Sequence, residues 1–470
     1  MQTASAALLA DRPDKLSRKT KLGFGVADLG GNLFFTIGGF YFLNFLTESL
    51  GLAAGLAGTA LMIGKIWDAV TDPAVGYISD RTHTRWGRRR PYMAVGAVFL
   101  LIFMILMFTN PRIQSDRLLF VWVVVVYCLL NTAYTLVNIP YSALTPELTS
   151  DFDERTVLNG YRMSFAVVGT LIGAGAMLPL VAVFGGGSAG WTITGGIMGV
   201  IMAVTTMITV LTVKETLGAP VAQATNVIKS YIQVLGMKTF LLALLPWTFH
   251  ITGVNIVQAT MLYFFQNIYK SEGMFSIALL FLLVSSLGFI PVWVKISAKI
   301  GKKKSYNIGM LIVAAAVLVF TGFGPSLPIW FSFIIMALAG IGFATQYVMP
   351  YSIVPDIIEY DFAENGTRRE GVFYGMWTFA SKIGQAFGIA LTGWVLAAFA
   401  YQQPTDAIAE PVQSAGAITG IRILMGPIPA IFFVAGVIVL SFYPITREVY
   451  DQIMVKVRAR EAANGATPTE

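Results

Sequence analysis

The sequence predicts an all-α membrane protein with twelve transmembrane helices in two six-helix halves. Three observations predict this fold: an apolar composition, twelve apolar segments of membrane-spanning length, and an internal repeat. Of the 470 residues, 56% are hydrophobic and 12% are charged, whereas roughly 25% of the residues in a soluble domain are charged. A soluble chain of this length could not cover so much apolar surface. The composition therefore excludes a soluble protein.

Each predicted helix is an apolar run close to the length that a bilayer requires, which is roughly 20 residues. The twelve runs are 22–47, 55–79, 91–109, 118–144, 160–184, 191–213, 239–267, 274–298, 305–323, 328–354, 371–400 and 418–443.

The charge distribution predicts the orientation of these helices. Alternate connections are strongly basic: the N-terminal tail, residues 80–90, residues 295–304 and the C-terminal tail. Placing them in the cytoplasm leaves only four of the 32 Lys and Arg residues on the opposite side. The positive-inside rule then puts both termini in the cytoplasm, beneath an inner (plasma) membrane. The net charge of +7 therefore has a topological cause, and we expect no nucleic-acid partner.

An internal repeat organises the chain. Residues 86–92 (WGRRRPY) recur as 300–306 (IGKKKSY), and residues 138–148 (NIPYSALTPEL) recur as 348–357 (VMPYSIVPDI). Two parallel six-helix halves of this kind are the architecture of the major facilitator superfamily. We expect an N-terminal six-helix bundle (1–213), a cytoplasmic linker (214–238), a C-terminal six-helix bundle (239–443) and a cytoplasmic tail (444–470).

Charged residues inside the second apolar run indicate a transporter. Lys65, Asp68 and Asp72 are spaced i, i+3 and i+7, so they share one helical face. A carboxylate in hydrocarbon costs several kcal/mol, about 2.5–3.5 kcal/mol on an insertion scale. We therefore expect this face to line a bundle interior or a water-filled cavity that binds ions, protons or polar solutes. The structural alternative is that the two acids only pair with Lys65 and Lys382.

The sequence shows no pattern of a disulfide, a metal centre or an enzyme active site. Cys128 is the one cysteine and there are two histidines, so neither an intramolecular disulfide nor a Cys/His metal cluster can form. No nucleophile–base pair and no soluble catalytic domain is recognisable. We expect no enzyme activity and no cofactor. His83 and His250 are interpreted as ordinary surface or core histidines rather than as a proton relay.

Six segments resemble the glycoside–pentoside–hexuronide:cation symporters, the melibiose permease-like family of the major facilitator superfamily. They are KLGFGVADLG (21–30), KIWDAVTDPAVGYISDRTHTRWGRRRPY (65–92), NIPYSALTPEL (138–148), YRMSFA (161–166), IVPDIIEYDF (353–362) and YGMWTFASKIGQAFG (374–388). The resemblance implies symport of a sugar-like solute with protons or sodium by alternating access. The alternative within the superfamily is a transporter of a non-sugar amphipathic solute, such as a lysolipid or a drug.

The resemblance implies a cation site on Asp68 and Asp72, completed by Thr135 and Asn138. Sodium takes about five or six hard oxygen ligands, and two adjacent carboxylates can instead share one proton near neutral pH. Melibiose permease has a carboxylate where this chain has Asn138. The site therefore has one negative charge fewer, which favours proton coupling and leaves sodium open.

For the solute, the resemblance points to Asp28 and Arg162, with Lys382 near the solute or neutralising the acids. A carboxylate that accepts from adjacent hydroxyls and a guanidinium that donates to ring oxygens can hold a sugar. The alternative is a salt bridge that only joins two helices. Ser142 and Ala27 depart from the family pattern, so galactoside recognition is not carried over. The candidates in the C-terminal half are Gln346, Tyr347, Trp377 and Thr378, with Asn255 and Gln258 as further cavity residues.

The remaining expectations concern gating and partners. Asp80, Arg81 and Arg85 match the cytoplasmic gate of the superfamily, which acts on conformation rather than on the solute. The expected partners are a small-molecule solute and membrane lipids, and we expect a monomer.

Overall fold

A computed structural model describes residues 15–82, 84–149, 152–215, 227–367, 369–405 and 411–463. These residues form helices and no β-strand, which confirms the predicted all-α class. The chain divides into two compact units. One comprises residues 1–222 with 389–414, and the other comprises residues 223–388 with 415–470.

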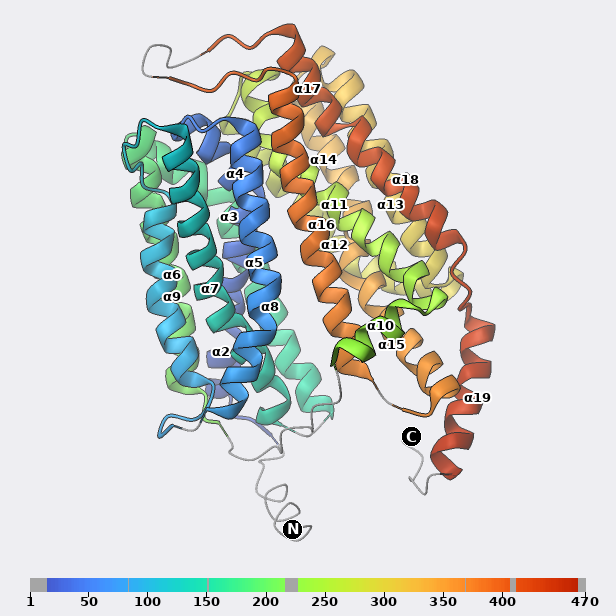
Figure 1. Ribbon diagram of the computed structural model, residues 1–470. Coiled ribbons are helices and arrows are strands. Elements are labelled where there is room, and N and C mark those ends of the chain that lie inside the picture. The colour runs from blue at the N-terminus through green and yellow to red at the C-terminus, as the bar shows by residue number, and fades with distance from the viewer. Residues whose placement is uncertain are drawn as a thin grey trace. The chain divides into compact units, whose positions relative to one another are not determined.

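The first unit contains the helices that Figure 1 draws in blue to green. They are α2 (Arg18–Gly25), α3 (Ala27–Phe40), α4 (Phe42–Asn44), the π-helical turn η1 (Phe45–Ser49), α5 (Ala54–Arg81), α6 (Arg90–Met107), α7 (Asp116–Leu148), α8 (Phe152–Val183) and α9 (Gly187–Thr212).

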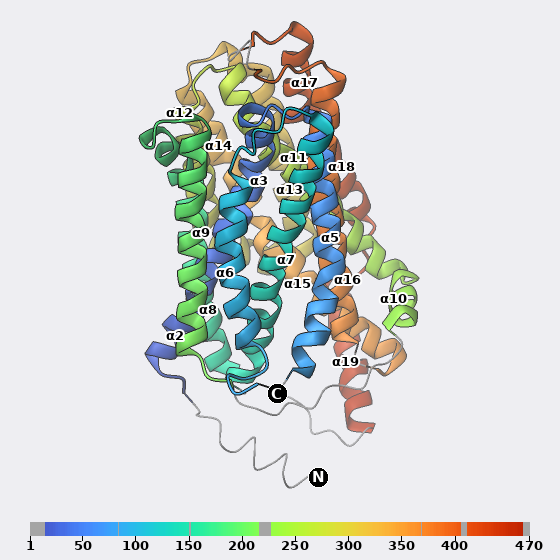
Figure 2. The ribbon, with the colours of Figure 1, turned by 60° about the vertical axis from the view of Figure 1, so that its left-hand side comes forward.

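Glycines allow the helices of the first unit to pack closely. The α3 helix packs on α8 and α9, α6 packs on α7 and α9, and α5 packs on α7; Figure 2 shows α6 and α9 side by side. A Cβ atom at Gly169 of α8 would lie 2.1 Å from the carbonyl oxygen of Leu29 in α3. No side chain fits there, so the two backbones touch, as small residues permit in membrane helices.

Residues 389–398, the end of α16, also belong to the first unit and pack on the start of α5. A Cβ at Gly393 would lie 2.3 Å from the carbonyl oxygen of Ala54 and 2.8 Å from the Cα of Gly58. At the next residue of α16, the indole N–H of Trp394 donates to the hydroxyl of Thr59 at 3.0 Å. Glycine is therefore required at this crossing.

The second unit contains the green to red helices of Figure 1. They are α10 (Val227–Leu235), α11 (Lys238–Asn267), α12 (Gly273–Ile300), α13 (Lys302–Phe323), the 3₁₀ turn η2 (Gly324–Ser326), α14 (Trp330–Phe343), α15 (Thr345–Asn365), α16 (Glu370–Ala398), α17 (Ala415–Met425), α18 (Pro427–Ser441) and α19 (Arg447–Ala463).

The packing order of the first unit recurs in the second. The pairs α5–α7, α6–α7, α6–α9 and α3–α9 have counterparts in α12–α14, α13–α14, α13–α18 and α11–α18. The counterparts occupy the same positions in the two halves of the sequence repeat. The α19 helix is an addition and packs on α15, where Arg460 donates to the carbonyl oxygens of Phe362 and Glu364 at 3.4 and 3.1 Å.

Nine helices among the described residues are long and apolar enough to cross a membrane, and a tenth crossing is possible if one bent pair counts as a single span. That pair joins 18–40 to 42–49 with a bend of 49°, inside the run predicted as 22–47. The α5 and α16 helices have 28 and 29 residues and lie outside this count, since they carry polar residues. The total of twelve spans stays a prediction.

Candidate functional site

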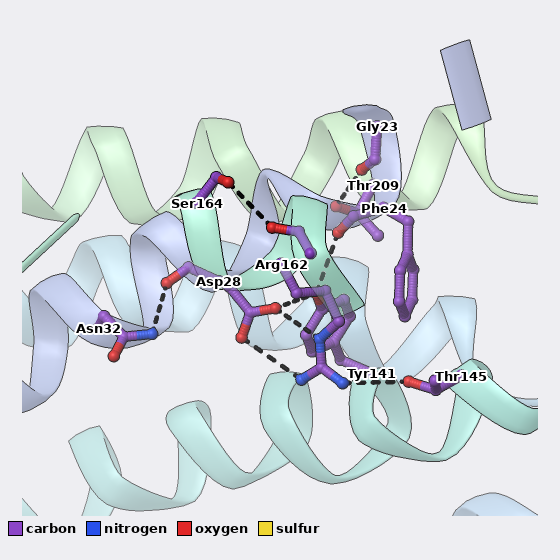
Figure 3. A network of polar contacts seen from close by, with 10 residues as sticks. Gly23, Phe24, Asp28, Asn32, Tyr141, Thr145, Arg162, Ser164 and Thr209 are labelled. Carbon is purple, nitrogen blue, oxygen red and sulfur yellow. Dashed lines mark hydrogen bonds and ion pairs between the residues drawn. The ribbon is translucent and has the colours of Figure 1, made fainter. Parts of the chain in front are cut away.

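The carboxylate of Asp28 and the guanidinium of Arg162 meet inside the first unit (Figure 3). Asp28 lies in the first turn of α3, and Arg162 reaches it from α8. The Nε atom of Arg162 donates to Oδ2 of Asp28 at 2.6 Å, and Nη2 donates to Oδ1 at 3.4 Å. The side chains are 13% and 17% exposed, with Asp28 the less exposed. A paired fork of this kind is stronger and more directional than a single hydrogen bond.

Tyr141 of α7 completes this cluster, as Figure 3 shows. Its hydroxyl oxygen lies 2.5 Å from Oδ2 of Asp28 and 3.0 Å from the carbonyl oxygen of Phe24. The hydroxyl has one proton, which goes to the nearer, charged acceptor. The ring of Tyr141 also lies 4.8 Å from the guanidinium carbon of Arg162, within the range of a cation–π contact. Tyr141 therefore orients both members of the pair.

The sequence reasoning missed Tyr141, although the repeat contained a signal. The residues 140–142 (PYS) recur as 350–352 (PYS) in the second half. A tyrosine at the same place in both halves is therefore a signal that the sequence carries for Tyr141. Arg162 is held on its far side by the hydroxyl of Thr145, which accepts from Nη1 at 3.2 Å. A solute site and an ion pair that only joins two helices are both compatible with this geometry.

The predicted cation residues Asp68, Asp72 and Thr135 come together between α5 and α7. The hydroxyl oxygen of Thr135 lies 3.0 Å from Oδ1 of Asp68 and 3.0 Å from Oδ1 of Asp72. Asp68 and Thr135 are 2% and 1% exposed. A hydroxyl has one proton and can donate to only one carboxylate. The proton of Thr135 therefore goes to one of the two carboxylates at a time.

Asn138, the fourth predicted cation residue, lines a cavity of about 90 Å³ together with Asp28. Tyr134, Tyr141 and Asn32 also line it. Apolar side chains such as Phe35 and Leu100 line the rest of it, and a space of this size holds several water molecules or a hydroxyl group of a solute. Asn138 lies one helical turn from Thr135 on α7, so the cavity reaches from the Asp28 cluster toward the paired acids.

Lys65 has a buried position beside the same acids on α5. It is 6% exposed, and its Nζ atom lies 5.8 and 5.3 Å from the ring centroids of Phe34 and Phe35. A buried ammonium that faces two aromatic rings gains cation–π stabilisation. The sequence predicted that this face of α5 points to a bundle interior, and the burial of Lys65 and Asp68 confirms it.

The candidates of the C-terminal half lie in the second unit on different faces. Trp377 and Gln346 are 3% and 7% exposed, whereas Tyr347 is 46% exposed. Thr378 is exposed and Lys382 is half-buried; they lie four residues apart on one face of α16. Trp377 and Gln346 are therefore buried inside the second unit, whereas Tyr347 and Thr378 are exposed. Asn255 is buried and donates to the carbonyl oxygen of Ile251 in its own helix at 2.8 Å. One N–H of the Asn255 side-chain amide is therefore already used within its own helix.

Near the predicted gate, Asp80 accepts from Arg89 at 3.1 Å, and the guanidinium of Arg81 lies 3.4 Å from the ring centroid of Tyr77. In the described part of the chain Asp80 pairs with Arg89 and not with Arg85, and His83 lies outside that part. The carboxylate of Glu215 accepts from the backbone N–H groups of Arg88, Arg89 and Arg90 at 2.7, 2.9 and 2.7 Å. This carboxylate caps the start of α6, where a helix has unpaired donors.

Known proteins resemble the chain over nearly its whole length. A family model described as "MFS/sugar transport protein" matches residues 23–447. The uncharacterised symporter sll1374 of Synechocystis is 27% identical, with 96% of this chain and 98% of the relative covered. The isoprimeverose transporter of Lactiplantibacillus pentosus is 30% identical, with 91% and 88% covered.

The fold is also that of solved transporters. A bacterial homologue of the human lysosomal transporter Spinster, in an inward-facing and unoccupied conformation, has a TM-score of 0.63 to this chain at 14% identity. The match covers 94% of this chain and 97% of the other. Together with the family match, this likeness confirms the predicted superfamily fold and a multi-pass membrane protein. The chain belongs to the sugar-transport family of the major facilitator superfamily, among the glycoside–pentoside–hexuronide:cation symporters, and is a transporter rather than an enzyme.

Proposed function

We propose that the chain is a symporter that couples uptake of a glycoside, pentoside or hexuronide to the entry of a proton or sodium ion by alternating access. The observation that carries this proposal is the cluster of Asp28, Arg162 and Tyr141 beside a cavity. The names of the relatives, a symporter and an isoprimeverose transporter, support it. We place the protein in the inner membrane as a monomer, with both termini on the cytoplasmic side where the basic connections predict them.

The solute binds at the Asp28 cluster. The carboxylate of Asp28 accepts from two adjacent hydroxyls of a sugar, and the guanidinium of Arg162 donates to its oxygens. Both groups are held in place before the solute arrives, by Tyr141 and Thr145. This arrangement reduces the ordering that binding requires. The carboxylate, amide and hydroxyl groups that line part of the cavity support a solute with several hydroxyl groups.

The coupling ion binds between Asp68 and Asp72. The Thr135 hydroxyl contacts both acids, which favours a site that holds one proton between two carboxylates. Sodium would use the same three oxygens with further ligands. Asn138 lines the cavity that contains Asp28 and lies on the same helix as Thr135. We propose that a change of charge at the acids reaches the solute site through this part of α7.

Transport into proteoliposomes tests the proposal. The probes are phenyl β-D-xyloside, phenyl β-D-glucoside and phenyl β-D-glucuronide, each supplied with an imposed proton gradient, an imposed sodium gradient or no gradient. We expect uphill accumulation of at least one probe under one gradient and none without a gradient. Accumulation that ignores both gradients would contradict symport, and binding of no probe would contradict the solute class.

A further inference from the structure

The carboxylate of Glu154 holds the start of α2. Its Oε1 atom accepts from the backbone N–H of Leu16 at 2.7 Å and from the ammonium group of Lys21 at 2.7 Å. Glu154 lies in the first turn of α8, whereas Leu16 lies just before α2 and Lys21 lies within it. Glu154 is 6% exposed, so the loss of one partner would leave a buried charge and costs more than the loss of an exposed pair. We call these three residues the N-terminal clasp.

A second ion pair, of opposite polarity, joins the same helical segments two turns further on. Lys21 and Asp28 are seven residues apart in the sequence. Glu154 and Arg162 are eight residues apart, and both spacings are about two turns of an α-helix. A shift of two turns in one direction would bring Lys21 opposite Arg162. A shift in the other direction would bring Asp28 opposite Glu154. Like charges repel, so the two pairs together favour one register of these helices.

The segment between Lys21 and Asp28 is a nearly continuous helix. Val26, the one residue between α2 and α3, has a φ of −62° and a ψ of −23°, close to helical values. Its N–H donates to the carbonyl oxygen of Leu22 at 3.1 Å, as in an α-helix. A helical backbone of this kind is stiff along its axis, so a displacement of Lys21 also moves Asp28.

Close contacts make the Asp28–Arg162 pair sensitive to such a displacement. A Cβ atom at Gly25 would lie 3.1 Å from the backbone carbonyl carbon of Tyr161, the residue before Arg162. The fork between Arg162 and Asp28 has a short arm of 2.6 Å and a long arm of 3.4 Å. The long arm already exceeds the usual length of a hydrogen bond, so a small shift of α3 along α8 breaks it.

The N-terminal clasp also reaches Tyr141 through the core. The side chain of Leu16 packs against a buried cluster that contains Phe24 and Tyr141. The ring centroids of Phe24 and Tyr141 lie 4.7 Å apart, and Figure 3 shows both residues beside Asp28 and Arg162. The N-terminal clasp therefore borders the cluster that carries the proposed function.

We propose that Glu154 is a positioning residue of the transporter, which sets the register in which Asp28 meets Arg162. The effect on solute affinity rests on the proposed function, whereas the effect on the ion pair does not. The N-terminal clasp then joins the helices, and the Asp28–Arg162 pair exchanges its contacts with a solute while the helices stay in register.

The first test measures glycoside affinity in detergent, at a temperature at which every variant is folded. Lys21→Met removes the ammonium group, and Lys21→Arg keeps a cation that reaches the carboxylate. Glu154→Gln keeps an acceptor for the N–H of Leu16 but removes the charge. Lys456→Met is the matched control, since it removes a lysine from an exposed pair with Glu364. The probe is the phenyl glycoside that the wild type binds.

We expect Lys21→Met and Glu154→Gln to weaken glycoside binding by about tenfold, because a displaced binding group loses affinity even in a folded protein. Lys21→Arg should bind within about twofold of the wild type, since the contact is a charge on one carboxylate oxygen rather than a fork. Lys456→Met should leave the affinity unchanged. Unchanged affinity in both Lys21→Met and Glu154→Gln, with only a lower melting temperature, would overturn the inference. Equal losses in Lys21→Arg and Lys21→Met would overturn it as well.

A second test needs no solute and so separates this inference from the proposed function. Melting temperatures are measured for Asp28→Asn, for Glu154→Gln and for the double variant. If Glu154 positions Asp28 against Arg162, Asp28→Asn should lower the melting temperature of Glu154→Gln by about half, or less, of its effect in the wild type, because the two changes are coupled. Additive losses would overturn the inference. Coupled losses in a protein that binds no glycoside would refute the proposed function and support the positioning of Asp28 by Glu154.

Discussion

The hydroxyl of Tyr141 and the carboxylate of Asp28 lie 2.5 Å apart, and the same carboxylate receives the guanidinium of Arg162. Three helices, α7, α3 and α8, thus meet at one carboxylate. Removing any one of the three side chains leaves a partly buried polar group without its partner, which costs about 1–3 kcal/mol. The cluster therefore both joins helices and presents a prepared set of hydrogen-bonding groups.

Tyr141→Phe should weaken solute binding by about 10- to 100-fold, because the charge-assisted hydrogen bond to Asp28 is lost while the ring stays under Arg162. Isothermal calorimetry with the bound phenyl glycoside measures this change. Tyr41→Phe is the matched control. It removes a hydroxyl that donates to the carbonyl oxygen of Ala174 at 2.8 Å, and it should lower stability without changing affinity. Equal affinities of Tyr141→Phe and the wild type would remove Tyr141 from the solute site.

Asp72→Asn should abolish uphill accumulation while exchange of solute down its gradient continues. The amide cannot take up a proton and carries no charge for a cation, so the coupling ion loses half of its site. Counterflow and gradient-driven uptake, measured in the same proteoliposomes, separate the two activities. If both Asp68→Asn and Asp72→Asn accumulated solute at the wild-type level, these acids would have no part in coupling.

Asn138→Asp should increase the dependence of uptake on sodium. The change adds a third carboxylate one helical turn from Thr135, and more negative charge favours a metal ion over a single proton. Initial uptake rates over a series of sodium concentrations at constant pH measure the effect. An unchanged sodium response would show that this position does not set the choice of ion.

Glu215→Gln should lower stability by about 1 kcal/mol, because the amide is a weaker cap than the carboxylate for the three N–H groups at the start of α6. Thermal unfolding in detergent measures this loss of stability. Glu364→Gln is the control, since Glu364 forms an exposed pair with Lys456 at 3.1 Å, and exposed pairs contribute little. A larger loss in the control than in Glu215→Gln would contradict the capping account.

The apolar runs predicted the helices well, because the bilayer sets their length and their composition together. The bend beside Tyr41 and the break at Ala344 were not predictable, since helix pairs are interrupted there without a proline or a charge at the break. The meeting of Thr135 with Asp68 and Asp72 followed from the family resemblance, and the contacts confirm their proximity. Their role in cation binding stays a prediction.

Contacts between residues that lie far apart in the chain could not be predicted from the sequence. The cap that Glu215 provides depends on a connection that folds back more than 100 residues later, and no local pattern encodes it.

The central claim is that Asp28 and Arg162 hold the solute rather than only joining α3 to α8. The double charge swap, Asp28→Arg with Arg162→Asp, tests it most directly when phenyl glycoside binding is measured in detergent. An ion pair tolerates reversal because its energy is nearly symmetric, whereas a sugar site does not, since donors and acceptors would then face the wrong hydroxyls. The account predicts a folded, membrane-inserted protein that binds no glycoside. Recovery of binding in the swapped protein would contradict it.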